Sequence, residues 1–141
     1  MSFKASSLVE YNSVPNDGPP RKLGSTQVEL PEFRVPILKW AMANLDPSWL
    51  KGDGVEQRPH VTVLYGLEHD DPISVYRIAS EFGRPIRLEI GPLQRFSHDT
   101  QDVLYASIKS PDLHELSEKL RALPNQNSYP NYTPHMTIAY L

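Results

Sequence analysis

One tetrapeptide pattern occurs twice in this sequence, and its residue types could do acid–base chemistry. Residues 59–62 read Pro-His-Val-Thr, and residues 134–137 read Pro-His-Met-Thr. Each copy continues into an apolar, partly β-branched run that predicts a strand. Because successive side chains of a strand point to opposite faces, the histidine and the threonine of each copy share one face. Two such strands facing one another would bring two imidazoles and two hydroxyls to one small substrate.

These groups suit the cleavage of a phosphodiester. One imidazole can take the proton of the attacking oxygen while the other protonates the leaving oxygen, because imidazole titrates near neutral pH. The hydroxyls can donate to the non-bridging oxygens, where negative charge grows. A single strand histidine is more often structural, but its repetition within one pattern favours a shared site. The candidate catalytic residues are His60, Thr62, His135 and Thr137.

This chemistry needs neither a metal nor a cofactor, and we expect neither. Cysteine is absent, which excludes thiolate ligands, thiolate nucleophiles and disulfides. The sequence leaves open which histidine is the acid and which is the base, because that depends on the direction of the substrate.

The same alternation predicts the side chains behind the two motif strands. The apolar face of the first strand runs from Val61 to Tyr65, and that of the second runs from Met136 to Tyr140. Tyr65 and Tyr140 are therefore expected in the core.

Several other residues are candidates for substrate binding. Bases stack on aromatic rings, and Tyr105 alternates with apolar neighbours, so it could face the substrate or lie on an ordinary sheet surface. Tyr129 and Tyr132 precede the second motif and could clamp a base. Arg58 adjoins the first motif and could reach a phosphate, although an exposed arginine is the simpler interpretation.

The remaining histidines have simpler interpretations. His69 lies in an acidic loop, where a solvated loop is commoner than a metal site. His98 is expected in a turn, and His114 is expected on the outer face of a helix.

The composition is that of one globular domain. The chain has 141 residues, of which 39% are hydrophobic, and a formal net charge of -3. No apolar run is long enough to span a bilayer, and the first residues lack the apolar core of a signal peptide. We therefore expect a cytoplasmic protein without a membrane partner. The net negative charge gives no general attraction for a polyanion, so a small nucleotide fits better than duplex DNA.

Proline and glycine divide the chain into a first segment and a main domain. Residues 1–24 are expected to form an arm that could contribute one short strand around residues 7–11, and residues 25–141 a single domain. The expected strands are at 25–30, 59–65, 86–96 and 102–108 and after residue 134, and the expected helices are at 37–45, 72–82 and 111–120. In both halves a helix and a polar loop lead into the motif strand. The order predicts an α+β fold with antiparallel sheets flanked by helices.

The paired motifs resemble the signature of the two-histidine (2H) phosphoesterase superfamily. This superfamily includes the 2′-5′ RNA ligase-like cyclic phosphodiesterases and the phage anti-CBASS nucleases. The predicted hairpin of residues 88–105 is similar to the strand pair that separates the motifs in that family. The resemblance covers about residues 25–141 and implies a bilobal, pseudo-twofold fold with both motifs lining a central cleft. Relatives often carry more structure after the second motif, and the arm could supply a replacing strand.

The resemblance implies a metal-independent phosphodiesterase acting on a small nucleotide or a cyclic oligonucleotide. Compact members with a short hairpin look like the phage enzymes that destroy cyclic nucleotide immune signals. Two alternatives stay open. One is the processing of short RNA ends bearing 2′,3′-cyclic phosphates, and the other is a module that binds nucleotides without cleaving them. The sequence does not indicate the oligomeric state.

Overall fold

A computed structural model describes residues 2–3, 7–14, 21–68, 72–98, 100–127 and 131–141. Its strands are β1 (Ser2–Phe3), β2 (Ser7–Val14), β3 (Arg21–Glu29), β4 (His60–Leu67), β5 (Ile86–Arg87), β6 (Glu89–His98), β7 (Gln101–Lys109) and β8 (His135–Tyr140). Its α-helices are α1 (Arg34–Asn44), α2 (Pro72–Phe82) and α3 (Pro111–Leu120), and short 3₁₀ turns lie at Pro31–Phe33 and Pro47–Trp49. In the described part of the chain, no helix has the length and apolar character that crossing a bilayer requires.

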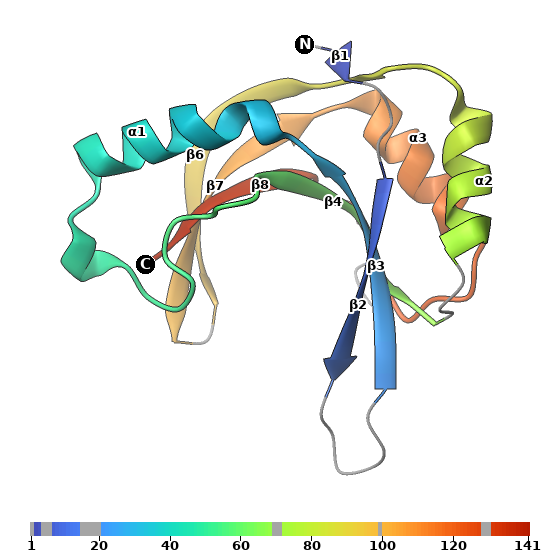
Figure 1. The fold of residues 1–141 in the computed structure, drawn as a ribbon, viewed down its shortest axis with the longest axis horizontal. Coiled ribbons are helices and arrows are strands. Elements are labelled where there is room, and N and C mark those ends of the chain that lie inside the picture. The colour runs from blue at the N-terminus through green and yellow to red at the C-terminus, as the bar shows by residue number, and fades with distance from the viewer. Residues whose placement is uncertain (1, 4–6, 15–20, 69–71, 99, 128–130) are drawn as a thin grey trace.

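The main sheet is symmetric about its centre. Its six strands follow the order β2-β3-β4-β8-β7-β6, and all its neighbours are antiparallel. One half runs β2, β3, α1, β4, and the other runs β6, β7, α3, β8, so each half is a hairpin, a helix and a motif strand. Figure 1 shows β4 and β8 in the middle of the view, with α1 to the left and α2 and α3 to the right. The predicted α+β fold with its pseudo-twofold repeat is confirmed.

The first segment of the chain belongs to this sheet. β2 pairs with β3 from Ser7 opposite Val28 to Val14 opposite Arg21. The expected boundary at residue 24 therefore falls inside β3, which begins at Arg21. By the symmetry of the strand order, β2 holds the place in its half that β6 holds in the other.

Buried apolar side chains from the helices and from one face of the sheet form a single core. On α3 the predicted stripe of Leu113, Leu116 and Leu120 is buried. On α2 the buried residues are Val75, Ala79 and Phe82. Two residues of the stripe predicted for α2 are instead exposed, Ile73 by 62% and Tyr76 by 51%. Because one face of each helix packs on the sheet, the opposite face of the sheet is left for the motif side chains.

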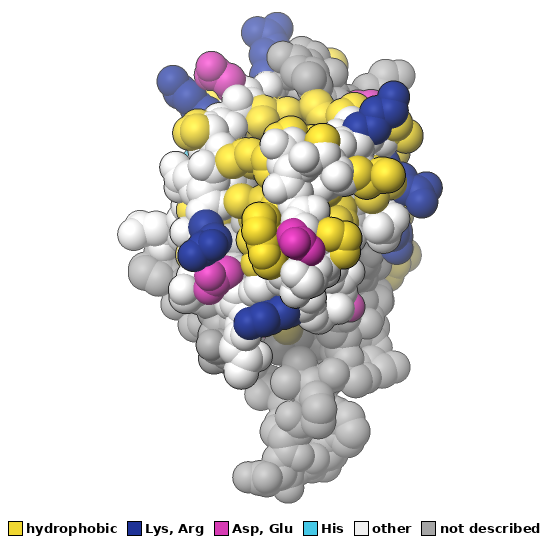
Figure 2. Space-filling model, turned by 90° about the vertical axis from the view of Figure 1, so that its left-hand side faces the viewer, with side chains coloured by type: hydrophobic (Ala, Val, Ile, Leu, Met, Phe, Trp, Pro, Cys, Tyr) yellow, Lys and Arg dark blue, Asp and Glu magenta, His cyan; other side chains and the backbone are white. Residues whose placement is uncertain are grey.

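Helix α1, like α2, has apolar side chains on more than one face. Ile37 and Ala41 are buried, whereas Val35 and Met42 are exposed. Hydrophobic side chains gather on the side of the molecule where α1 and β6 lie (Figure 2).

Both motif strands contain a β-bulge at the same distance from their histidine. Thr26 pairs with Leu64 and the next residue of β3 pairs with Thr62, so one residue of β4 is passed over. In the same way Leu104 pairs with Ala139 and the next residue of β7 pairs with Thr137. An extra residue reverses the alternation of side chains beyond the bulge. Two consecutive residues are accordingly buried at each bulge.

The bulges move two tyrosines to the face of the histidines. Tyr65 pairs with Ser25, and Tyr140 pairs with Val103, both on the motif face of their strands. Neither tyrosine belongs to the core cluster or packs against it, and Tyr65 is 39% exposed. The prediction that both lie in the core was wrong, because strict alternation does not hold across a bulge.

Candidate active site

The two motifs meet at the centre of the sheet. Val61 of β4 pairs with Met136 of β8 in an antiparallel register. Continuing this register by one residue in each direction places His60 opposite Thr137 and Thr62 opposite His135. Each histidine directly precedes one member of the pair of Val61 and Met136, so the two histidines lie on either side of that pair along the strands, on the face opposite its side chains. Two imidazoles placed in this way could flank one phosphate.

Each imidazole is held by the same hydrogen bond. His60 Nδ1 lies 2.8 Å from the backbone oxygen of Arg58, and His135 Nδ1 lies 3.0 Å from that of Thr133. A carbonyl oxygen can only accept, so Nδ1 carries the proton in both rings. Nε2 is then the nitrogen that faces a substrate. It can take a proton when the ring is neutral and give one when the ring is charged.

The prolines explain why the motif begins one residue before each histidine. Proline holds the residue before it in an extended conformation, and that residue supplies the carbonyl that anchors the histidine. Pro59 and Pro134 are both buried. The oxygen of Pro59 accepts from the Leu30 amide at 2.8 Å, and the oxygen of Pro134 accepts from the Ile108 amide at 3.1 Å. The pseudo-twofold symmetry therefore extends to the groups that support the histidines.

The two threonines are half-buried beside the histidines. Among the residues that the structure describes, neither Thr62 nor Thr137 has a hydrogen-bond partner for its hydroxyl. Both hydroxyls are therefore available as donors to the oxygens of a bound phosphate.

An aromatic wall stands beside His135. Tyr105 pairs with Thr137 in the sheet, and its ring centroid is 5.5 Å from that of His135. The ring of Phe96 lies 5.3 Å from Tyr105 and 6.4 Å from His135. The hydroxyl of Tyr105 donates to Gln94 Oε1 at 2.8 Å. Tyr105, which could face the substrate or lie on an ordinary sheet surface, lies on the motif face beside His135. Phe96 was not predicted, and it reaches the same face because its partner on β7 lies two residues before Tyr105.

Polar groups stand beside His60 instead. Glu29 pairs with His60, and Gln27 pairs with Thr62. Arg58 Nη2 lies 2.8 Å from Glu29 Oε1, and the arginine side chain is 65% exposed. Arg58 is thus next to the motif, as expected, with Glu29 as an ion-pair partner that sequence reasoning missed. The two sides of the site share the same arrangement of histidine and threonine but present different neighbouring side chains.

Comparison with known proteins identifies the family. A family model described as the 2′-5′ RNA ligase superfamily matches residues 30–141. The chain belongs to the 2′-5′ RNA ligase superfamily. This is the 2H phosphoesterase superfamily that the motifs resemble, and membership supports a phosphoesterase-type activity. A search of curated proteins finds no significant match.

Tyr132, one of the predicted binding residues, lies against the core rather than on the motif face. The ring of Tyr132 packs against the hydrophobic core and lies 5.1 Å from the ring of His114 on α3. Its hydroxyl donates to the backbone oxygen of Thr62 at 2.7 Å, and burial raises the pKa of Tyr132 above its ordinary value. The structure therefore does not bring Tyr132 to the motif face. Tyr129, a candidate for clamping a base, and His69 of the acidic loop lie outside the described residues.

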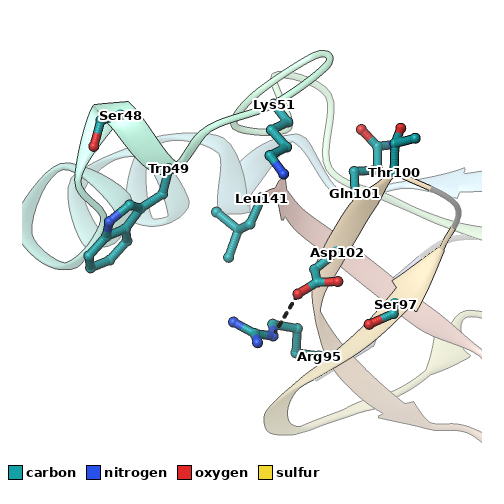
Figure 3. A pocket seen from close by; sticks show the side chains of 9 residues that line it. All are labelled: Ser48, Trp49, Lys51, Arg95, Ser97, Thr100, Gln101, Asp102 and Leu141. Carbon is teal, nitrogen blue, oxygen red and sulfur yellow. Dashed lines mark ion pairs between the residues drawn. The ribbon is translucent and has the colours of Figure 1, made fainter.

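A hollow of about 670 Å³ lies away from the motif residues (Figure 3). Trp49, Lys51, Arg95 and Leu141 stand around it, and Arg95 forms an ion pair with Asp102 at 3.1 Å. Arg95 pairs with Leu104, which packs on the core, so this hollow opens on the face opposite the histidines. Within the described ranges, no three His, Cys, Asp or Glu side chains gather in a way that could hold a metal ion.

Proposed function

We propose that this protein is a metal-independent phosphodiesterase that hydrolyses a small nucleotide or a cyclic oligonucleotide. The observation that carries the proposal is the pair of histidines on one sheet face, each anchored through Nδ1 to a backbone carbonyl. Imidazoles fixed in this way, on either side of one position, suit general acid–base catalysis.

In the proposed step, Nε2 of one neutral histidine takes the proton of the attacking oxygen as that oxygen forms a bond to phosphorus. The opposite phosphorus–oxygen bond breaks, and the leaving oxygen takes a proton from Nε2 of the other, charged histidine. Proton exchange with water restores both rings. Thr62 and Thr137 donate to the non-bridging oxygens, where negative charge grows in the transition state.

The flanks of the site support a nucleotide substrate. Phe96 is 41% exposed and stands with Tyr105 beside His135. Exposed aromatic rings next to a phosphate site suit the stacking of a base. On resemblance to the compact phage enzymes, we propose the degradation of cyclic nucleotide immune signals in the cytoplasm of a host cell as the biological role.

The test is an assay of the full chain in EDTA against cyclic dinucleotides, cyclic trinucleotides, 2′,3′-cyclic nucleotides and short RNAs, with products identified by mass spectrometry. Cleavage of a cyclic oligonucleotide that is lost in His60→Ala and His135→Ala would support the proposal. His114→Ala removes an exposed histidine from α3 and should keep full activity. Cleavage restricted to RNA ends would favour RNA processing, and tight binding without turnover would favour a nucleotide-binding module.

A further inference from the structure

The two tyrosines that the bulges turn to the motif face lie at opposite ends of the site. Because β4 and β8 are antiparallel, Tyr65 lies beyond Thr62 and His135, whereas Tyr140 lies beyond Thr137 and His60. The partners of Tyr65 and Thr62 on β3 are two residues apart, so each tyrosine is about 7 Å along its strand from the nearest motif threonine. The two tyrosines are then about 20 Å apart along the strands, with the histidines between them.

The backbone of each tyrosine is hydrogen-bonded to the loop that precedes the other motif strand. The Asn127 side chain donates to the backbone oxygen of Tyr65 at 3.2 Å. At the other end, the Tyr140 amide donates to Gly54 O at 2.9 Å, and the Lys51 amide donates to Tyr140 O at 3.0 Å. These loops also bridge directly to the strands, with Val55 opposite Ala139 and Leu67 opposite Asn125. The backbone that carries each ring is therefore hydrogen-bonded to a loop from the other half of the fold.

The two tyrosines also differ in their surroundings. Tyr65 is 39% exposed. Tyr140 is half-buried, and burial together with Glu56 and Asp53 raises the pKa of its hydroxyl. The hydroxyl of Tyr140 thus stays protonated well above neutral pH and remains a hydrogen-bond donor.

An isolated tyrosine on a sheet surface would need no explanation, because tyrosine is common in strands. Here the same arrangement occurs twice. Each half contains a histidine, a threonine, a bulge and a tyrosine at matching positions. A bulge disrupts the local ladder and commonly re-aims a side chain next to a functional site. A tyrosine repeated at each end of a symmetric site fits a ligand that extends to both sides of the reacting phosphate.

We propose that Tyr65 and Tyr140 each contact one of the two nucleosides that flank the reacting phosphate. The site then takes an internucleotide phosphodiester, with a nucleoside on both sides, in preference to a terminal 2′,3′-cyclic phosphate, which has a nucleoside on one side only. This inference rests on the proposed function for the position of the phosphate between the two histidines.

The test compares Tyr65→Ala and Tyr140→Ala on a cyclic dinucleotide and on a 2′,3′-cyclic mononucleotide. Loss of a stacked base costs roughly 5- to 150-fold in affinity. Each variant should therefore raise KM for the cyclic dinucleotide by about that factor with a smaller change in kcat, whereas at most one should affect the mononucleotide. Tyr76→Ala, at an exposed position on α2, is the matched control. A cyclic-dinucleotide KM that stays at the wild-type value in either tyrosine variant would overturn the inference.

A binding measurement separates this inference from the proposed function. Calorimetry with cyclic di-AMP and cyclic di-GMP, in the His60→Ala background, gives the Kd without turnover. Binding that depends on both tyrosines, without cleavage by the wild type, would overturn the proposed function and keep the inference. Cleavage by the wild type with a Kd that is unchanged in the tyrosine variants would keep the proposed function and overturn the inference. The absence of both binding and cleavage would overturn the proposed function and the inference together. Leucine at each position, checked by thermal melting, replaces any alanine variant that does not fold.

Discussion

Replacing Tyr132 by phenylalanine tests whether this residue positions β4 or binds the substrate. The substitution removes only the hydroxyl that donates to the Thr62 backbone oxygen at 2.7 Å and keeps the ring that packs on the core. A lost hydrogen bond costs about 1 kcal/mol, and an acceptor left unpaired can raise the cost to about 3 kcal/mol. For a domain of this size, each kcal/mol lowers Tm by roughly 4 °C. We therefore expect Tyr132→Phe to lower Tm by about 4–12 °C.

The pH dependence of stability gives a second measurement on the same variant. Burial raises the pKa of Tyr132 in the folded protein above the ordinary value of 10.0. Its contribution is then fully present below about pH 10 and is lost as the pH rises further, because the unfolded chain releases the phenolic proton first. Urea unfolding between pH 8 and pH 11 should show a steeper loss of stability for the wild type than for Tyr132→Phe.

The same variant should leave substrate affinity nearly unchanged, with KM within about twofold of the wild type. Tyr76→Phe, on the exposed side of α2, controls for the loss of a tyrosine hydroxyl. This variant should change neither Tm nor KM. The reasoning would be refuted if Tyr132→Phe melted like the wild type while Tyr132→Ala melted normally and raised KM tenfold or more, because Tyr132 would then contact the substrate.

Three further predictions concern the reaction itself. EDTA should leave the rate unchanged, and inhibition that zinc or manganese reverses would indicate a metal mechanism. The pH profile of kcat/KM should be bell-shaped, because a neutral base and a charged acid must be present together, and a steady rise to pH 10 would exclude a histidine acid. Replacing Tyr105 by alanine should raise KM about 5- to 150-fold through the loss of base stacking, with a smaller effect on kcat, and an unchanged KM would remove Tyr105 from the binding surface.

The fold class and the centre of the site could be predicted from the sequence because their signals are local. Pro-His-x-Thr marks both motif strands, and the helical spacing of Leu113, Leu116 and Leu120 marks α3. Each signal needs only the residues within one element.

The features that could not be predicted from the sequence depend on the pairing of segments that are distant in the chain. Tyr65 and Tyr140 change face because β3 and β7 pass over one residue of β4 and β8, and a bulge leaves no clear mark in the bulged strand itself. Tyr132 looked like a loop residue free to bind a base, and its partner Thr62 lies 70 residues earlier in the sequence. Glu29 became part of the site only through the register that sets it beside His60.

The central claim is that His60 and His135, from the two halves of the fold, act on one phosphate. The most direct measurement is kcat/KM on the cleaved substrate for His60→Ala, His135→Ala and the double variant. Each single variant should lose about 10²- to 10⁴-fold. The double variant should be little slower than the slower single variant. An acid and a base act together in one step, so the loss of either one already removes most of their joint contribution. Full activity in either single variant, or losses that multiply in the double variant, would contradict the claim of one shared site.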